Sequence, residues 1–426
     1  MSSIPKGTRD FTPSQQIKRE IIIEKIKSVF RKYGFDPIET PTFEYYKTLA
    51  GKYGEEGERL IYKFTDFKKR ELALKYDLTV PLARFFSDHQ NEIVKPFKRY
   101  QIQPVFRAEK PQRGRYREFY QCDIDILGSK NLLSDITIIL TINDALKTIN
   151  IKDFKFKINH RYFFYSLAKR YNAENRELEL ARTIDKLEKI SKEGVIEELK
   201  RKNFSNEIIN DLINLIFEKR ELKDFFEIFH DEYSKKAYED LKYIFSFLEK
   251  YNVDFEFDIS LARGLDYYTG MIFEVVLKNV NIGSIASGGR YDNLVEIFTK
   301  YKVPAVGGSI GIDRLLSALQ ELEILENRKT YTDIVIAVIG ENPDIITYAL
   351  EVLFSFQKIN YNVDLYVGEG DIRAQLGYAN DKGARIAIIL GEEEFERKTI
   401  KVKYLNEKIQ EEVKFDEIEK RFNFKF

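Results

Sequence analysis

The sequence predicts an α+β protein: a strand-rich region interrupted by a helical insertion, followed by a smaller C-terminal α/β domain. Three observations indicate this. Short β-like runs broken by turns extend from about residue 35 to 128, a highly charged stretch with helical periodicity runs from about 161 to 250, and strands alternate with helices after residue 330. Since 426 residues exceed the size of one hydrophobic core, we expect two or three domains and place the boundaries at 1–327 and 328–426.

The first expected element is a capped amphipathic helix. Thr12 is a suitable N-cap, Pro13 occupies the first helical position, and apolar residues recur as far as Phe30 before Gly34 supplies a stop. These signals together predict a helix of roughly 20 residues.

Strands at 71–75 and 119–126 are predicted next. Because side chains alternate along a strand, Phe119, Gln121, Asp123 and Asp125 fall on one face of the second run. Two carboxylates and an amide should therefore line a common surface.

Past the insertion, strands are expected at 254–259 and 271–277, and the glycine-rich segment 306–316 is interpreted as a turn leading into a helix. In the C-terminal domain we expect strands at 333–340, 361–366 and 384–390 and helices at 344–357 and 372–380.

Composition excludes several classes of protein. No stretch approaches the roughly 20 apolar residues of a membrane span, and the N-terminus lacks the apolar core of a secretory signal. One cysteine and three scattered histidines exclude a disulfide framework and any zinc-site spacing, so a bound metal would have to sit on oxygens. The net charge of zero means that any RNA must be held by local patches. A cytoplasmic enzyme fits these features.

The densest chemical signal is the segment 107–117, which places five cations around the single acid Glu109, with Pro111 and Gly114 supplying a turn. The cations are Arg107, Lys110, Arg113, Arg115 and Arg117. Guanidinium groups bind phosphate oxygens bidentately and keep their charge, so the loop suits a polyanion. A solvated basic hairpin is the alternative interpretation.

Two further segments carry arginines. In the segment 262–270, Arg263 precedes a glycine and the pair Tyr267 and Tyr268; the arginine could face a phosphate, or it could pair with Asp266 beside two core tyrosines. In the segment 307–314, three glycines precede Arg314, a weak pattern that is not a P-loop, because no Gly-Lys-Ser/Thr follows.

These segments resemble the signature motifs of class II aminoacyl-tRNA synthetases, and of the histidyl-tRNA synthetase family in particular. The matching segments are 6–10, 76–82, 107–125, 263–268, 287–292 and 308–314. The resemblance runs nearly end to end and misses only the insertion at about 161–250. It implies a catalytic domain with an antiparallel sheet flanked by helices, and an enzyme that ligates L-histidine to tRNA(His) through histidyl-adenylate at the expense of ATP.

The resemblance also implies roles on the ATP side. Arg107 would hold both the α-phosphate and the carboxylate of histidine, which brings the attacking oxygen to phosphorus. Glu109 would read the adenine amino group, and Phe119 would stack on the ring. Arg115 and Arg314 would clamp the triphosphate, and Mg²⁺ is expected on the β- and γ-phosphates.

Histidine selection follows in the same way. Asp77, Thr79 and Gln121 would bind the ammonium group, and Asp125 and Tyr268 would contact the imidazole, whose hydrogen bonds an apolar isostere could not replace. The predicted histidine-binding residues are Asp77, Thr79, Arg107, Gln121, Asp125, Arg263, Tyr267 and Tyr268.

Arg107 and Arg263 are the predicted catalytic residues, the latter as a fixed charge near the α-phosphate. No protein metal ligand is expected. At Asp77 many bacterial members carry glutamate, and the segment 76–82 resembles the archaeal and eukaryotic form.

Partners are implied as well. Pro41 matches the proline of the motif at the subunit interface, which implies a homodimer. The segments 374–380 and 383–392 resemble an anticodon-binding domain, yet residues 331–426 hold 13 basic and 18 acidic residues, a net charge of −5. Such a domain would read unstacked bases by specific contacts and stacking.

Two alternatives remain open at this point. One is a regulatory relative such as the synthetase-like subunit of ATP phosphoribosyltransferase, which senses histidine without charging tRNA. The other is an RNA-binding protein that retains an inactive synthetase fold. The C-terminal segment and Arg263 argue against the first, and Arg107 and Arg314 argue against the second.

Overall fold

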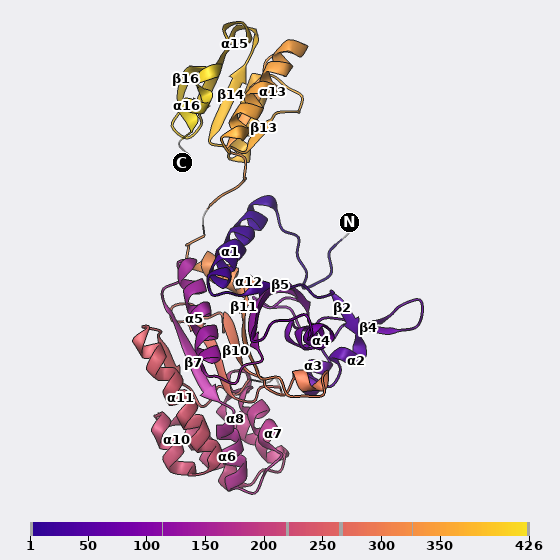
Figure 1. Cartoon of the computed structure of the whole chain (residues 1–426), viewed down its shortest axis with the longest axis vertical. Helices are drawn as coiled ribbons and strands as arrows, with labels where there is room; N and C mark the ends of the chain where they lie inside the picture. Colours follow the sequence, from indigo (N-terminus) through magenta and orange to yellow (C-terminus); the bar gives the residue numbers. More distant parts are fainter. Residues whose placement is uncertain (1–2, 113, 219–220, 264–266, 326, 424–426) are drawn as a thin grey trace. The chain divides into compact units, whose positions relative to one another are not determined.

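The structure is a computed structural model that describes residues 3–112, 114–218, 221–263, 267–325 and 327–423. Arg113 and the segment 264–266, both singled out in the sequence, lie outside the described residues. The chain forms two compact units: Met1–Arg9 with Ile22–Leu325, and Asp10–Ile21 with Glu326–Phe426 (Figure 1). No helix of the described residues is long and apolar enough to cross a membrane.

The first unit is built on a large sheet, eight-stranded in its described part. Its strands, in spatial order, are β1 (Asp36–Pro37), β5 (Phe97–Phe106), β6 (Glu118–Leu127), β11 (Ala305–Gly311), β10 (Ala286–Arg290), β9 (Met271–Leu277), β7 (Phe154–His160) and β8 (Phe255–Phe257). The inner pairs are antiparallel, as predicted. At the two edges β1 pairs with β5, and β8 with β7, in parallel, so the sheet is mixed.

Helices cover this sheet. They are α1 (Pro13–Lys32), α4 (Thr79–His89), α5 (Leu133–Thr148), α12 (Ile312–Glu321) and the 3₁₀ turn η1 (Val295–Ile297). The predicted N-terminal helix is thus confirmed as α1, whose Ile26 and Phe30 are fully buried. α5 is apolar on most sides and is buried along most of its length, as expected for a helix packed between layers.

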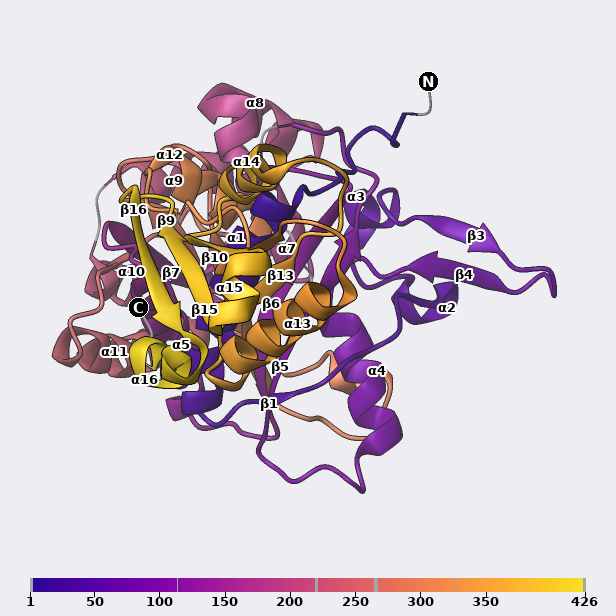
Figure 2. The same ribbon diagram turned by 90° about the horizontal axis from the view of Figure 1, so that it is seen from above.

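A small three-stranded sheet extends from the same unit and carries a hairpin that projects from its body (Figure 2). Its strands are β2 (Phe43–Tyr45), β4 (Glu71–Leu74) and β3 (Lys63–Thr65), with the short helices α2 (Tyr46–Leu49) and α3 (Gly54–Glu58) beside them.

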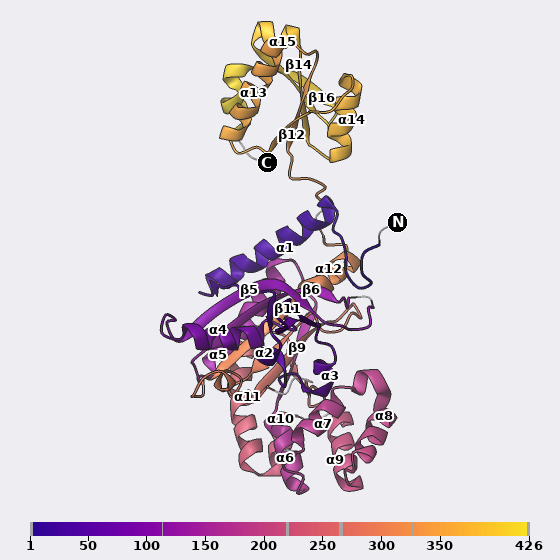
Figure 3. The same ribbon diagram turned by 90° about the vertical axis from the view of Figure 1, so that its right-hand side faces the viewer.

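Between β7 and β8 the chain forms successive helices that gather at one end of the sheet (Figure 3). They are α6 (Tyr162–Arg170), α7 (Glu177–Ile184), α8 (Leu187–Arg201), α9 (Asn206–Phe217), α10 (Leu222–Phe229) and α11 (Glu232–Lys250). Aromatic contacts join them to the sheet, because Phe163 of α6 and Phe225 of α10 both pack on Phe257 of β8.

The second unit contains a sheet with α13 and α14 on opposite faces (Figure 3). Its strands, in spatial order, are β13 (Val363–Leu365), β12 (Ile334–Val338), β14 (Ile386–Leu390), β15 (Thr399–Tyr404) and β16 (Ile409–Lys414). Its helices are α13 (Pro343–Lys358), α14 (Ile372–Lys382), α15 (Glu392–Arg397), η2 (Phe415–Glu417) and α16 (Ile418–Phe422). The predicted strands and helices are confirmed within a few residues. The antiparallel hairpin β15–β16 was not predicted.

The interpretation of 306–316 as a turn leading into a helix was wrong in its first half, because residues 305–311 form the central strand β11. The glycines serve close approach rather than a turn. A Cβ on Gly307 would lie 1.8 Å from Asp125 Oδ1, and one on Gly308 would lie 2.6 Å from the Ile142 side chain. Strand β11 can pack between β6 and α5 only without side chains at these positions.

Candidate active site

Strand β6 presents the polar face that the sequence predicts. In the sheet register Gln121 lies opposite Gly311 and Asp123 opposite Ser309, so alternate residues of β6 share one face with β11. Gln121 Nε2 donates to Ser309 Oγ at 2.8 Å, while Gln121 Oε1 is buried with no hydrogen-bond partner among the described residues. An unpaired buried acceptor is costly, so this oxygen is suited to receive a ligand donor.

Asp125 is held at the end of this face by two partners that the sequence alone did not reveal. Its Oδ2 forms an ion pair with Arg99 Nη2 at 2.5 Å, and its Oδ1 accepts a hydrogen bond from the Tyr291 hydroxyl. Burial raises the pKa of Asp125, and Arg99 and Tyr291 oppose that shift. The carboxylate is therefore fixed in orientation before any ligand arrives.

Asp123 lies on the same face but has no comparable cation of its own. Burial raises its pKa to about 7, with Arg99 opposing the shift and Asp125 adding to it. The predicted face includes Asp123, but the predicted binding residues do not. The alternation that selected its neighbours on β6 applies equally to it, so this signal was already in the sequence.

Asp77 and Thr79 lie where β4 leads into helix α4. Asp77 Oδ1 accepts from the backbone N–H of Val80 at 3.1 Å and from the Tyr53 hydroxyl at 3.0 Å. Its Oδ2 is buried and has no hydrogen-bond partner among the described residues. Burial raises the pKa of Asp77, and the Val80 N–H and Arg107 oppose the shift. A cationic ligand group would satisfy the remaining oxygen.

Arg107 follows β5 and lies between two aromatic rings. Its guanidinium carbon is 4.3 Å from the Tyr76 ring centroid and 5.1 Å from that of Phe119, and its Nε donates to the Tyr76 carbonyl at 3.1 Å. Burial alone would lower the pKa of Arg107, but Tyr76, Glu109 and Asp77 raise it above its ordinary value. Both Asp77 and Glu109 therefore stabilise the charge of Arg107.

The basic loop folds back toward helix α12. Glu109 lies 4.0 Å from Arg107 and 3.8 Å from Arg115, so this one acid neighbours two of the predicted ATP-binding arginines. Arg314 Nη1 donates to the Ser284 carbonyl at 2.5 Å, and its Cγ lies 3.6 Å from where a Cβ on Gly114 would be. Burial and the neighbouring Arg115 lower the pKa of Arg314. The structure thus brings Glu109, Arg115 and Arg314 together.

Arg263 lies close to Tyr268 and Glu274. Its backbone is left-handed, with φ of 57°, and its side chain pairs with Glu274 of β9. The alternative pairing with Asp266 concerns a residue outside the described ones. Arg263 Nε is buried without a hydrogen-bond partner among the described residues, and Glu274 and Tyr268 raise the pKa of this guanidinium although burial opposes them.

Tyr267 and Tyr268 follow this loop, and Tyr268 lies near the acidic residues of the polar face. Their rings lie 4.9 Å apart, and the Tyr267 ring is 5.9 Å from that of Tyr291. Burial raises the pKa of Tyr268 to about 12; Arg263 opposes the shift, and the carboxylates of Asp125, Asp123 and Asp77 add to it. Tyr268 therefore remains a neutral donor over the physiological pH range.

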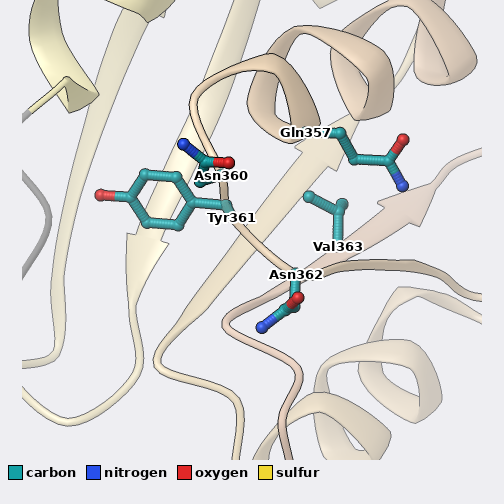
Figure 4. Close-up of a pocket in the computed structure, with 5 residues that line it drawn as sticks. All are labelled: Gln357, Asn360, Tyr361, Asn362 and Val363. Atoms are coloured by element: carbon teal, nitrogen blue, oxygen red, sulfur yellow. The ribbon is translucent and has the colours of Figure 1, made fainter. Parts of the chain in front are cut away.

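A separate pocket lies in the second unit, where α13 leads into β13 (Figure 4). It is lined by Gln357, Asn360, Tyr361, Asn362 and Val363. Its polar groups are neutral amides and one phenol, and Asn362 already donates to the Tyr331 carbonyl at 3.0 Å. The residues that line this pocket include no charged group for phosphate chemistry, unlike the basic loop with Arg107 and Arg115.

Family models and curated relatives match most of the chain. The family model described as histidyl-tRNA synthetase matches residues 7–315, and that described as anticodon binding domain matches residues 333–424. A histidine–tRNA ligase of Cytophaga hutchinsonii is 40% identical, with 98% of each chain covered.

Solved structures agree too. The chain resembles a histidyl-tRNA synthetase from Nostoc sp. with a TM-score of 0.83, 31% identity, and 98% and 99% of the two chains covered. It shares a fold, at 24% identity and a TM-score of 0.77, with an ATP phosphoribosyltransferase regulatory subunit/histidyl-tRNA synthetase from Bacillus halodurans, covering 92% of this chain and 98% of the other. Family models spanning most of the chain and a relative at 40% identity lead to one conclusion: the chain belongs to the histidyl-tRNA synthetase family.

Proposed function

We propose that the polar face of β6, with the loops around it, is where this aminoacyl-tRNA synthetase performs the reaction of its family. The enzyme ligates L-histidine to tRNA(His): a carboxylate oxygen of histidine attacks the α-phosphorus of ATP and expels diphosphate, and the terminal ribose hydroxyl of the tRNA then displaces AMP from histidyl-adenylate. The observation that carries the assignment is the position of Arg107, a partly buried cation influenced by both Asp77 and Glu109.

On the ATP side, Arg107 is proposed to hold the α-phosphate against the histidine carboxylate, so that the two reacting atoms meet. Glu109 would accept from the adenine amino group and Phe119 would stack on the base. Arg115 and Arg314 would bind the triphosphate, which is supported by their mutual proximity and by the unfavourable effect of Arg115 on the Arg314 charge. A polyanion between them would relieve that repulsion.

On the histidine side, Asp77, Thr79 and Gln121 are proposed to bind the ammonium group. The unpaired Asp77 Oδ2 and Gln121 Oε1 support this, because each is a buried acceptor. Asp125 would accept a hydrogen bond from the imidazole of histidine, and Tyr268 would donate one to it, with Tyr267 beside them. Asp125 already has protein partners, but each carboxylate oxygen can accept more than one hydrogen bond. The likeness of the segment 76–82 to archaeal and eukaryotic members stays a prediction.

Arg263 is proposed to supply a fixed positive charge near the α-phosphate. Its ion pair with Glu274 orients it, and its unpaired Nε is available to an oxygen acceptor. Mg²⁺ is proposed to accompany ATP. We expect this ion to be bound mostly by phosphate and water. When bound, it would neutralise charge on the β- and γ-phosphates.

A homodimer is part of the proposal. The small sheet, which begins just after Pro41, carries three exposed aromatic side chains: Phe43 is 51% exposed, Tyr45 46% and Phe64 40%. The rings of Phe43 and Phe64 contact each other. A cluster of exposed aromatic rings on one sheet face is typical of a protein–protein interface.

The remaining assignments concern organisation. We place the catalytic domain at residues 1–327, its helical insertion at about 161–250, and the anticodon-binding domain at 328–426, where it would contact tRNA(His). A cytoplasmic location is proposed, because the substrate tRNA is used in translation.

The experiment that tests this function measures exchange of pyrophosphate into ATP with each amino acid, followed by charging of a tRNA(His) transcript. Exchange should depend on histidine, and charging should follow. A regulatory subunit, the second candidate given its shared fold, would bind histidine without charging tRNA. Exchange supported by another amino acid and not by histidine would contradict the assignment.

A further inference from the structure

We propose that residues 6–9 form a strap that fixes the basic loop against helix α12, and that Arg9 is the positioning residue that holds Arg115 and Arg314 in register for the triphosphate. This inference rests on the proposed assignment of those two arginines to ATP. The strap belongs to a matching motif, Lys6 to Asp10, for which no role follows from the site described above.

The backbone of the strap is bonded to the last residue of the basic loop. Arg117 N–H donates to the Gly7 carbonyl at 2.8 Å, and Arg117 Nη1 donates to the Lys6 carbonyl at 3.1 Å. Arg117 Nε donates in addition to the Glu109 carbonyl at 3.1 Å. One guanidinium therefore ties the strap to both ends of the loop.

Gly7 fits the loop so closely that no side chain is possible. Its φ is 93°, and an added Cβ would lie 2.8 Å from Arg117 Cγ and 2.8 Å from Pro111 Cγ. The left-handed backbone and the close contacts each favour glycine. The strap thus packs against the loop along its backbone.

Arg9 extends this connection to helix α12. Its Nη2 forms an ion pair with Asp313 Oδ1 at 2.5 Å, and its guanidinium carbon lies 3.2 Å from the Tyr116 ring centroid. Asp313 is almost fully buried, and its Oδ2 accepts from the Tyr120 N–H at 2.8 Å. Arg9 therefore joins Tyr116, the neighbour of Arg115, to Asp313, the neighbour of Arg314.

Such a connection is needed because Arg115 and Arg314 repel each other before ATP arrives. Arg115 is among the groups that disfavour the charged form of Arg314. Two like charges separate unless the scaffold holds them together, and separation would spread the cations that the triphosphate must bridge. Because Arg9 holds the residues next to Arg115 and Arg314 in the chain, it can set the spacing of the two arginines without touching substrate.

The test measures the Michaelis constants of pyrophosphate exchange for ATP and for histidine in Arg9→Ala, Arg9→Lys, Arg115→Ala, Arg314→Ala and the surface control Arg397→Ala. We expect Arg9→Ala to raise the KM for ATP about tenfold, the change produced by losing roughly one charged hydrogen bond, with the KM for histidine nearly unchanged. Arg9→Lys should recover part of the loss, because it keeps the ion pair with Asp313.

Limited trypsin digestion without ATP gives a second readout. Cleavage after Arg115 should be several times faster in Arg9→Ala than in the wild type and in Arg397→Ala, because the released loop becomes accessible. Thermal unfolding identifies a variant that fails to fold. If Arg9→Ala fails to fold, the same measurements are made on Arg9→Lys.

The outcomes separate two failures. If Arg115→Ala and Arg314→Ala leave the KM for ATP unchanged, the proposed ATP site is wrong and the strap proposal falls with it. If both raise the KM for ATP while Arg9→Ala changes neither that KM nor the cleavage rate, the strap proposal alone is overturned. An equal rise in both Michaelis constants would also overturn it, since that result indicates general loosening of the fold.

Discussion

At the scale of single residues, the site depends on how buried charges are paired. Asp125 is fixed by Arg99 and Tyr291, whereas Asp123, two residues earlier on the same face, carries a pKa of about 7. Burial favours the neutral form of a carboxyl group that lacks a cation of its own. The two acids of one strand therefore differ in the partners that stabilise their charged forms.

This difference predicts the pH dependence of Asp123→Asn. The folded pKa of Asp123 lies above its ordinary value, so the folded protein binds the proton more tightly, and the wild type loses stability as the pH rises from about 4 to 7. The variant lacks this loss. Relative to that of the wild type, the unfolding free energy of the variant should therefore rise by on the order of 2 kcal/mol between pH 5 and pH 8. Urea denaturation at the two pH values measures the gain.

Arg99, Asp125 and Asp77 are the charged groups that contribute to this shift. A constant difference between variant and wild type at all pH values would show that Asp123 is ionised throughout this range.

At the scale of elements, the central strand β11 determines the shape of the polar face. Its glycines allow β6 and α5 to approach it from both sides, which the sequence pattern could not reveal: a glycine run without alternation is typical of turns, and the contacts come from residues far away in the chain. The hairpin β15–β16 was missed although Ile400 and Val402 alternate with charged residues, a pattern typical of a half-buried strand.

The alternation in β6, by contrast, predicted which side chains share a face, because that property is local. Their partners Arg99, Tyr291 and Ser309 lie on other strands or loops, and no spacing in the sequence connects them.

Gly307→Ala tests the close approach of β11 and β6. The new Cβ would lie 1.8 Å from Asp125 Oδ1, so the carboxylate must leave Arg99 and Tyr291. We expect a loss of about 2 to 4 kcal/mol of stability and a raised KM for histidine. The matched control is Gly377→Ala in α14, where no atom lies within 4 Å and alanine should be neutral or stabilising. Equal stability of Gly307→Ala and wild type would contradict the packing argument.

At the scale of the whole molecule, one chain contains a catalytic unit and an anticodon-binding unit, and two such chains are proposed to associate. The exposed aromatic side chains of the small sheet are the surface proposed for that association.

Phe43→Lys should therefore shift the protein from dimer to monomer at micromolar concentration, because a charge replaces the centre of an apolar contact. Sedimentation velocity measures the change. Phe354→Lys, at an equally exposed position on α13, serves as the control and should leave association unaltered. A wild-type monomer, or a dimer indifferent to Phe43→Lys, would disprove the proposed interface.

Arg263 and Arg107 are proposed to act together on one reaction, the attack of histidine on the α-phosphate. Histidine-dependent pyrophosphate exchange by Arg263→Ala tests it most directly. Losing a fixed charge beside the reacting phosphate should lower the rate by about 10²- to 10³-fold, or roughly 3 to 4 kcal/mol of barrier, while histidine still binds. Exchange at the wild-type rate would remove Arg263 from the mechanism and contradict the account.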